Sequence, residues 1–391
     1  MPVSDLPPEI LDVVIDELQE DKKSLLHASL ACKTLCPRTR VHLFSAVTVS
    51  SRYCCDRLRE LITVSPKLAL HFKTLEIMIM YSSDTYAPEV YGALTVIESL
   101  INVTRLSLSS GHWQHMPDTV VSSLQSHSYR TLDIFSSFRF RSIGEICSLV
   151  QNSPNLQQVR IMSDNPSMRE ECNLNHSLHC TPALVLLHID DCYVNSDSAG
   201  NLLKLVISPG PCPFFCSNIH ILSIALPDKT RTIVPQLNQY LAVSRSSLKH
   251  LVVSHLSGFR DVSSETLNIT GVEHITVRIL DFESTPRDQA SRIFTWWISN
   301  LSAVDEHCTI RSVSFAIMSV HQPEGHPALD WEDLWMRLDE CLASYKMALL
   351  KRVAVTFEPR PSEWDTLKDR MEGNFPRLKR LGREVVFDAT T

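Results

Sequence analysis

A spacing of apolar residues recurs along most of this 391-residue chain and narrows the folds open to it. Each occurrence has an apolar residue, two other residues, a second apolar residue, one further residue and a third apolar residue. Phe72, Leu75 and Ile77 form the first occurrence. The alternation at the end of each occurrence predicts a short β-strand, because successive strand side chains point to opposite faces. Nine more occurrences begin at Val103, Tyr129, Leu156, Leu184, Ile219, Leu248, Val272, Ile310 and Leu350, and a weaker eleventh begins at Leu378 and Leu381.

Helical periodicity fills many of the stretches between these predicted strands. A chain that alternates strand and helix predicts right-handed crossovers and a parallel sheet. The first positions of successive occurrences lie 24 to 40 residues apart, which brackets the period of leucine-rich repeats but is too irregular for a consensus array. The predicted helical segments are 89–100, 118–127, 143–151, 199–207, 236–243, 289–301 and 331–345.

These units resemble leucine-rich repeats, except that nearly every unit lacks the asparagine that usually ends the strand turn. The resemblance implies an α/β fold in which residues 51–391 form an irregular leucine-rich-repeat solenoid. Its parallel strands would lie on the concave side and its helices on the convex side. A non-solenoid α/β domain with similar strands is the alternative, because short apolar runs do not distinguish the two.

In such a solenoid the residues between the apolar strand positions face the concave surface. They combine both charges with aromatic side chains, as protein-binding surfaces do, and no single sign of charge dominates. We therefore expect this surface to bind an unidentified protein substrate. The candidate substrate-binding residues are Glu76, Asp133, Phe135, Arg160, His188, His250, His274, Arg278 and Arg352.

The first fifty residues predict three short helices. Asp5 can cap the first helix, with Pro7 and Pro8 in the first turn, where a missing backbone N–H costs nothing. Apolar residues at helical spacing between Ile10 and Leu18 predict an amphipathic helix of about three turns. Two further helices are expected within residues 24–44. So small a body has little core, and its wide apolar stripe calls for a partner surface.

The same residues resemble the F-box motif, and their sequence is most similar to that of F-box proteins of mushroom-forming (basidiomycete) fungi. The resemblance rests on Leu6-Pro7-Pro8-Glu9-Ile10-Leu11, Val14-Ile15, Leu18, Leu25-Leu26, Leu30-Ala31-Cys32-Lys33, Leu35 and His42-Leu43-Phe44. It implies that residues 1–50 form an F-box-like helical module that binds a Skp-type adaptor and through it a cullin scaffold. The residues carried over as adaptor-binding are Leu6, Pro7, Ile10, Leu11, Ile15, Leu18, Leu25, Leu26 and Leu30.

Together, the two resemblances imply the substrate-recognition subunit of an SCF-type cullin–RING ubiquitin ligase. Such a subunit positions a substrate for ubiquitin conjugation and performs no catalysis itself. The F-box motif often carries tryptophan where this chain has Leu35. That departure leaves open a repeat-protein scaffold whose degenerate F-box no longer recruits a ligase, and a hydrolase on an α/β scaffold is a third alternative.

Motifs for catalysis and for metal binding are missing from the sequence. No nucleophile elbow, phosphate loop, two-histidine metal helix or redox cysteine pair has the required spacing. The segment 172–180 holds two cysteines and two histidines, but structural zinc sites generally use two ligand pairs separated by a longer loop. We therefore predict no catalytic residue, no metal and no cofactor.

Charge and cysteine content indicate the partners and the compartment. The formal net charge is -7 and the basic residues are scattered, which argues against nucleic acid as a partner. The N-terminus carries Asp5, Glu9 and Asp12 in place of a secretory signal, and no apolar stretch approaches membrane-spanning length. We expect a cytoplasmic or nuclear protein without membrane contact, whose twelve cysteines are mostly free thiols.

Overall fold

The computed structural model describes residues 6–79, 88–162, 184–190, 198–207, 218–226, 233–255, 265–281, 287–319, 332–361 and 364–390. The chain divides into two compact units, Met1–Leu156 and Gln157–Thr391. Within each unit, every described strand pairs in parallel with the next strand along the chain. This pairing confirms the predicted α/β class with parallel strands. Asp5 and the segment 172–180 lie outside the described residues.

Three short helices begin the first unit. They are α1 (Pro8–Glu17), α2 (Lys22–Ala31) and α3 (Cys36–Leu43). The first helix starts directly after Pro7, and no side chain caps it. The second starts at Asp21, whose carboxylate accepts hydrogen bonds from the backbone N–H groups of Lys23 and Ser24 at 3.1 Å. Both α1 and α2 pack against α3.

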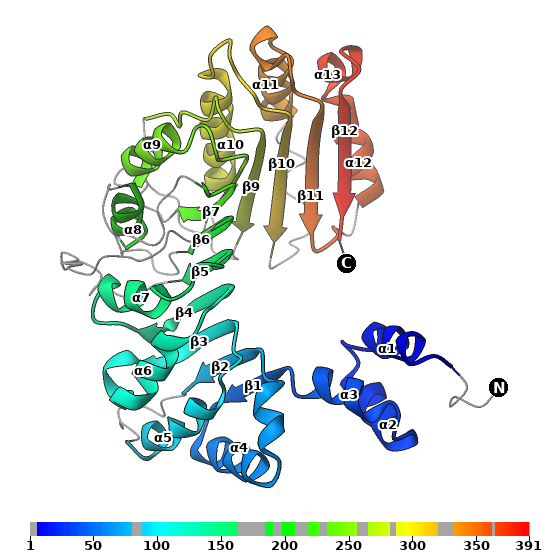
Figure 1. Ribbon diagram of the computed structural model, residues 1–391. Helices are drawn as coiled ribbons and strands as arrows, with labels where there is room; N and C mark the ends of the chain where they lie inside the picture. The colour runs from blue at the N-terminus through cyan, green and yellow to red at the C-terminus, as the bar shows by residue number, and fades with distance from the viewer. Residues whose placement is uncertain are drawn as a thin grey trace. The chain divides into compact units, whose positions relative to one another are not determined.

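Four described strands and their connecting helices complete the first unit. The strands are β1 (Ala46–Val49), β2 (Thr74–Met78), β3 (Arg105–His112) and β4 (Thr131–Arg139). Figure 1 shows the α-helices along one side of these strands. The α-helices are α4 (Arg52–Val64), α5 (Pro88–Ala93), α6 (Asp118–Ser126) and α7 (Ile143–Val150), with 3₁₀ turns η2 (Pro66–Leu70), η3 (Leu94–Ser99) and η4 (Trp113–His115).

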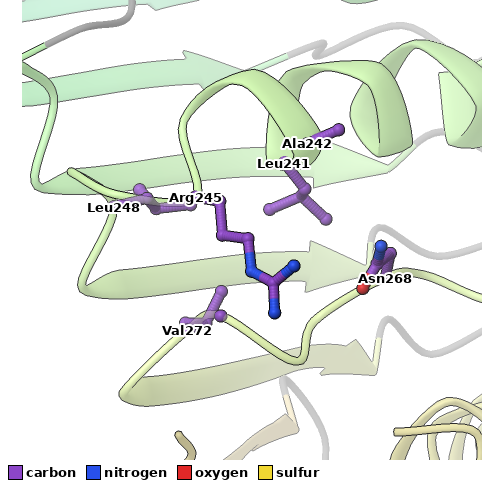
Figure 2. Close-up of a pocket in the computed structure, with 7 residues that line it drawn as sticks. Leu241, Ala242, Arg245, Leu248, Asn268 and Val272 are labelled. Atoms are coloured by element: carbon purple, nitrogen blue, oxygen red, sulfur yellow. The ribbon is translucent and has the colours of Figure 1, made fainter. Parts of the chain in front are cut away.

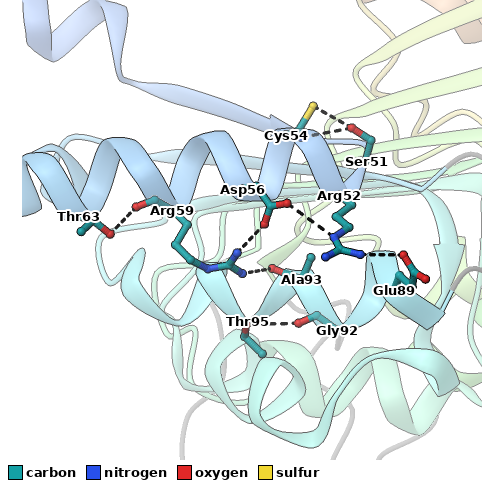
Figure 3. Close-up of polar contacts among 10 residues, drawn as sticks. All are labelled: Ser51, Arg52, Cys54, Asp56, Arg59, Thr63, Glu89, Gly92, Ala93 and Thr95. Carbon is teal, nitrogen blue, oxygen red and sulfur yellow. Dashed lines mark hydrogen bonds and ion pairs between the residues drawn. The ribbon is translucent and has the colours of Figure 1, made fainter.

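Charged side chains join α4 to α5 on the surface of this unit (Figure 3). Arg52 on α4 donates to Glu89 on α5 at 2.8 Å, and Arg59 donates to the carbonyl oxygen of Ala93 at 3.1 Å. Asp56 lies between the two arginines, 2.6 Å from Nη1 of Arg59 and 3.7 Å from Nε of Arg52. These groups are solvent-exposed, so they orient the helices but contribute little to stability.

Eight described strands form the sheet of the second unit. They are β5 (Gln158–Met162), β6 (Leu186–Asp190), β7 (Ile221–Leu226), β8 (His250–His255), β9 (His274–Asp281), β10 (Ser312–Ser319), β11 (Arg352–Glu358) and β12 (Glu384–Ala389). In Figure 1, the first three helices of this unit lie along one side of the strands from β6 to β9. The helices are α8 (Ser198–Ile207), α9 (Ile233–Val243), α10 (Arg287–Ser302), α11 (Glu332–Leu342), α12 (Trp364–Gly373) and α13 (Pro376–Arg380), with the 3₁₀ turn η8 (Tyr345–Met347).

The recurring apolar residues form the core of both units. Every apolar residue that defines the ten complete occurrences is buried, and none of these residues exposes more than 4 % of its surface. The strand register stacks equivalent positions, so that Leu75 pairs with Leu106 and Leu106 with Leu132. Apolar side chains from successive strands therefore form continuous rows beneath the helices, as the alternation predicts.

The first strand, β1, was not predicted. Phe44, Val47 and Val49 repeat the same apolar spacing one unit before the first predicted occurrence. Val47 and Val49 pair with Leu75 and Ile77 of β2, which places them in the same rows, where Val49 is fully buried and Val47 is half-buried. The spacing could have revealed β1, but these residues fall where the helical module was expected to end.

The eleventh occurrence, predicted to begin at Leu378 and Leu381, does not coincide with a strand. Leu378 lies in α13, where it is fully buried, and Leu381 is 55 % exposed after the end of that helix. Gly382 follows with a φ of 70°, a left-handed conformation that commonly ends helices. Only then does β12 begin, and it pairs in parallel with β11. The three-residue helical spacing of the two leucines imitated the start of a strand pattern.

Candidate functional site

The helices α1, α2 and α3 enclose a small apolar core. Leu11 and Ile15 on α1 are 5 % and 2 % exposed, and Leu25 on α2 is fully buried. Leu18, at the end of α1, is half-buried. The spacing of the α1 residues by four and three positions places them on one side of the helix. These side chains therefore fill the space between the helices.

A polar cluster of three residues joins α1 to α3. The Nε and Nη2 atoms of Arg38 donate hydrogen bonds to the two carboxylate oxygens of Asp16 at 2.6 and 2.5 Å. Nε2 of His42 lies 2.7 Å from Oδ1 of Asp16. The hydrogen bond from Arg38, followed by that from His42, lowers the pKa of Asp16 to about 2. The carboxylate is therefore ionised except at strongly acidic pH, and it holds the two helices together.

The outer sides of α1 and α2 present apolar side chains to solvent. Residues three and four positions apart lie on the same side of a helix, so these side chains form a stripe along each helix. We call the six residues concerned the outer stripe. Their exposed fractions are 38 % for Leu6, 50 % for Ile10, 58 % for Val13, 51 % for Val14, 50 % for Leu26 and 78 % for Leu30.

The nine residues predicted to bind an adaptor fall into two sets. The inner set fills the helical core, and the outer set is exposed. Val13 was not among the nine, but it is exposed beside the outer set, and its spacing of three residues from Ile10 could have identified it as a further adaptor-binding candidate. The inner set is Leu11, Ile15, Leu25 and the half-buried Leu18, and the outer set is Leu6, Pro7, Ile10, Leu26 and Leu30.

Three predicted substrate-binding residues lie on the strands of the first unit. Glu76 on β2 accepts hydrogen bonds from hydroxyl groups of Thr48 on β1 and Ser109 on β3 at 3.0 and 2.8 Å. Asp133 on β4 is 5 % exposed and accepts a hydrogen bond from Nη2 of Arg105 at 2.9 Å. Both carboxylates are therefore bound by neighbouring strands. Phe135 is half-buried two residues further along β4.

The other six candidates lie on the strands of the second unit. Register places Arg160 beside His188, and His250 beside His274. The residue that follows each candidate along its strand is buried beneath the helices, as Leu251, Ile275 and Val353 are, so the candidates point to the opposite side of the sheet. We call that side the open face. The six residues are Arg160 on β5, His188 on β6, His250 on β8, His274 and Arg278 on β9, and Arg352 on β11.

Two histidines meet on the open face. The rings of His250 and His274 lie edge to face, with centroids 6.0 Å apart. Nε2 of His250 lies 2.9 Å from Oγ1 of Thr276, and Nδ1 of His274 lies 2.8 Å from Oγ of Ser312. Burial, followed by the positive charges of His274 and Arg278, lowers the pKa of His250 below its ordinary value of 6.5. The sheet thus holds two imidazoles in fixed orientations near an arginine.

A small cavity lies near the end of α9, away from the open-face candidates. Figure 2 shows the Arg245 side chain reaching between Leu241, Asn268 and Val272. Gly271 permits this approach, because a Cβ atom there would lie 2.8 Å from Cγ of Arg245. The cavity measures about 110 Å³, whereas pockets for small molecules usually span about 300 to 1,000 Å³. It therefore gives no support to a small-molecule site.

The part of the chain that the structure describes contains no group of three histidine, cysteine, aspartate or glutamate side chains that could bind a metal ion. None of the helices described has both the length and the hydropathy of a bilayer-spanning segment. Comparison of the sequence with models of known protein families and with curated proteins gives no match. The outer stripe and the open face are the two candidate binding surfaces described above.

Proposed function

We propose that this chain is the substrate-recognition subunit of an SCF-type cullin–RING ubiquitin ligase. In this proposal α1, α2 and α3 form the F-box and bind a Skp-type adaptor, which links the chain to a cullin scaffold. The strands and helices that follow form an irregular leucine-rich-repeat solenoid, and its concave surface includes the open face. The chain acts by position, because binding a substrate beside the conjugating enzyme raises the effective concentration of its lysines.

The exposed outer stripe is the observation that carries this proposal. The helix α1 has only 10 residues, yet it buries Leu11 and Ile15 on one side and exposes Ile10, Val13 and Val14 on the other. A helix of a small globular body normally places polar residues on its solvent side. Covering apolar surface is worth about 25 cal/mol per Å², so a partner that covers the stripe gains stability from it. The resemblance to the F-box motif supports a Skp-type adaptor as that partner.

The inner contacts of the helical module support the proposal in a second way. Binding loses less conformational entropy when the docking surface already has its bound form. The core around Ile15 and the hydrogen bonds of Asp16 to Arg38 and His42 fix α1 against α3. The outer stripe is therefore held in place before any partner arrives.

Size-exclusion chromatography of the purified chain with a Skp-type adaptor and a cullin tests the proposal. We expect the three proteins to elute together. The variant Leu30→Glu should elute apart from the adaptor and keep its circular dichroism spectrum, because Leu30 is 78 % exposed. Val64→Glu is the matched control, because Val64 is an 86 % exposed apolar residue on α4, outside the outer stripe. This control should still elute with the adaptor.

Two results would count against the proposal. Co-elution of Leu30→Glu as complete as that of wild type would place the adaptor elsewhere on the chain. Failure of the folded wild-type chain to bind any Skp-type adaptor would favour a scaffold that recruits no ligase.

A further inference from the structure

The open face of the second unit has a distinct chemistry over four strands. Register aligns three rows of side chains across β8, β9, β10 and β11. The rows contain histidine, arginine, hydroxyl and small apolar side chains, but no carboxylate. The first row is His250, His274, Ser312 and Arg352, the second is Val252, Thr276, Ser314 and Ala354, and the third is Ser254, Arg278, Ala316 and Thr356.

Carboxylates border this area. Glu273 precedes β9 and forms an ion pair with Arg311, Asp281 and Glu358 end β9 and β11, and Glu384 and Asp388 lie on the neighbouring strand β12. Oε2 of Glu384 lies 3.8 Å from Nε of Arg352, and both side chains are more than half exposed. An ion pair this exposed is weak, so another carboxylate could replace Glu384. Arg278 is exposed, and no described residue forms an ion pair with it.

The basic groups of this area repel one another. The pKa of His250 lies below 6.5 partly because His274 and Arg278 place positive charge nearby. A carboxylate bound among these groups would relieve that repulsion and favour the charged imidazole. The area is therefore complementary to negative charge.

The spacing of the basic groups favours a peptide chain over a small anion. Strands about 4.8 Å apart place β9 and β11 about 10 Å apart, and four residues along β9 separate His274 from Arg278 by about 13 Å. A single phosphate or carboxylate cannot contact groups so widely spread. An extended peptide rises about 3.3 Å per residue, so carboxylates three or four residues apart match these distances. The three rows contain no phenylalanine, tyrosine or tryptophan, and their two imidazole rings already lie edge to face against each other, which argues against a stacking platform for single-stranded nucleic acid.

We propose that the open face over β8 to β11 binds an extended acidic segment of the substrate protein. Its aspartate and glutamate side chains would contact His250, His274, Arg278 and Arg352. This inference deepens the proposed function and rests on it for the role of the open face in substrate binding. It adds the chemical class of segment that the substrate must present.

Fluorescence anisotropy with the full chain tests this inference. The probe is a fluorescein-labelled peptide of glutamate and serine, and the comparison peptide has lysine in place of every glutamate. We expect the glutamate peptide to bind more tightly, with affinity that falls as salt is added. Arg278→Glu and Arg352→Glu should each weaken binding about threefold to tenfold, since each reverses one exposed charge. Arg337→Glu is the matched control, because Arg337 is an exposed arginine on helix α11 of the same unit.

The outcomes separate this inference from the proposed function. Weaker peptide binding by Arg278→Glu and Arg352→Glu, with adaptor binding unchanged, supports both. Failure of the wild-type chain to prefer the glutamate peptide, while the adaptor still binds, overturns the acidic segment and leaves the proposed function intact. An equal loss of peptide affinity in the Arg337→Glu control would mean that the effect comes from the net charge of the protein and not from the open face, and it would also overturn the inference. Tighter binding of a single-stranded RNA to the same two arginines would overturn it in favour of nucleic acid.

Discussion

The ring of Phe44 meets the ring of Phe72 edge to face, with centroids 6.2 Å apart and planes at 83°. Phe44 directly follows the helix α3, and Phe72 lies two residues before the strand β2. The carbonyl oxygen of Ser45 also accepts hydrogen bonds from the N–H groups of Lys73 and Thr74 at 2.7 and 2.9 Å. The helical module thus continues into the strands through packed contacts, with no separate linker between them.

Removing the Phe72 ring should destabilise this junction. Phe72 is 4 % exposed, and replacing a buried phenylalanine with alanine typically costs about 3 to 5 kcal/mol in free energy of unfolding. Urea denaturation of Phe72→Ala, followed by circular dichroism, should show that loss. Tyr53→Ala is the control, because Tyr53 is 72 % exposed and its removal should change stability by less than about 0.5 kcal/mol. Equal midpoints for the two variants would contradict the packing described for Phe72.

The Asp16 cluster should make the helical module sensitive to acid. Hydrogen bonds from Arg38 and His42 lower the pKa of Asp16 from 3.8 to about 2. A lowered pKa in the folded state means that the stabilisation is complete above 3.8 and is lost as pH falls through about 2. Asp16→Asn should therefore show a smaller drop in melting temperature over that range than wild type. Glu17→Gln, an exposed change on the same helix, should melt like wild type at each pH.

Acidic peptide binding should strengthen as pH falls. The pKa of His250 is lowered by burial and by the positive charges of His274 and Arg278, so its imidazole is neutral above 6.5. A bound carboxylate raises that pKa, so binding takes up a proton and becomes tighter below 6.5. Anisotropy titrations of wild type and His250→Gln on either side of this pH measure the effect. An identical pH dependence in both proteins would remove His250 from the binding area.

Asp339 should stabilise the C-terminal end of the second unit. Its carboxylate is 2 % exposed and accepts hydrogen bonds from the backbone N–H groups of Arg377 and Leu378 at 2.9 and 3.0 Å. It therefore caps α13 from α11, and losing a cap of this kind typically costs about 1 to 2 kcal/mol. Denaturation of Asp339→Ala should show that loss, whereas Asp333→Ala, exposed on the same helix, should not. An unchanged free energy of unfolding in Asp339→Ala would mean that the cap does not stabilise the protein.

The strands were predictable because sheet and helices together require apolar side chains at fixed intervals. Leu75, Leu106 and Leu132 lie where the spacing placed them, and the register aligns them. The prediction from the spacing was wrong where a helix and a strand lie next to each other in the sequence. Phe44 follows the helix α3 directly and also begins the first strand unit, so β1 was missed. Leu378 belongs to the helix α13, whose spacing of apolar residues resembles the strand pattern.

The candidate surfaces were less predictable because they depend on packing and register. Periodicity identified Ile10 and Leu11 as apolar, but it could not show that only Leu11 faces the core. The side of α1 that faces the core depends on how α1 packs against α3, to which Asp16 is hydrogen-bonded. His250 and His274 each follow the first apolar residue of their occurrence by two positions, so the repeat indicates that they are neighbours on adjacent strands. It does not indicate that their rings meet or that they contact Thr276 and Ser312.

Titration calorimetry of a Skp-type adaptor into the purified chain tests the central claim most directly. The comparison is between wild type, Ile10→Glu on α1 and Met336→Glu on α11, since the two residues are 50 % and 51 % exposed. We predict saturable binding that Ile10→Glu weakens by about tenfold or more and Met336→Glu leaves unchanged. Equal binding by all three proteins, or no binding by the folded wild type, would contradict it.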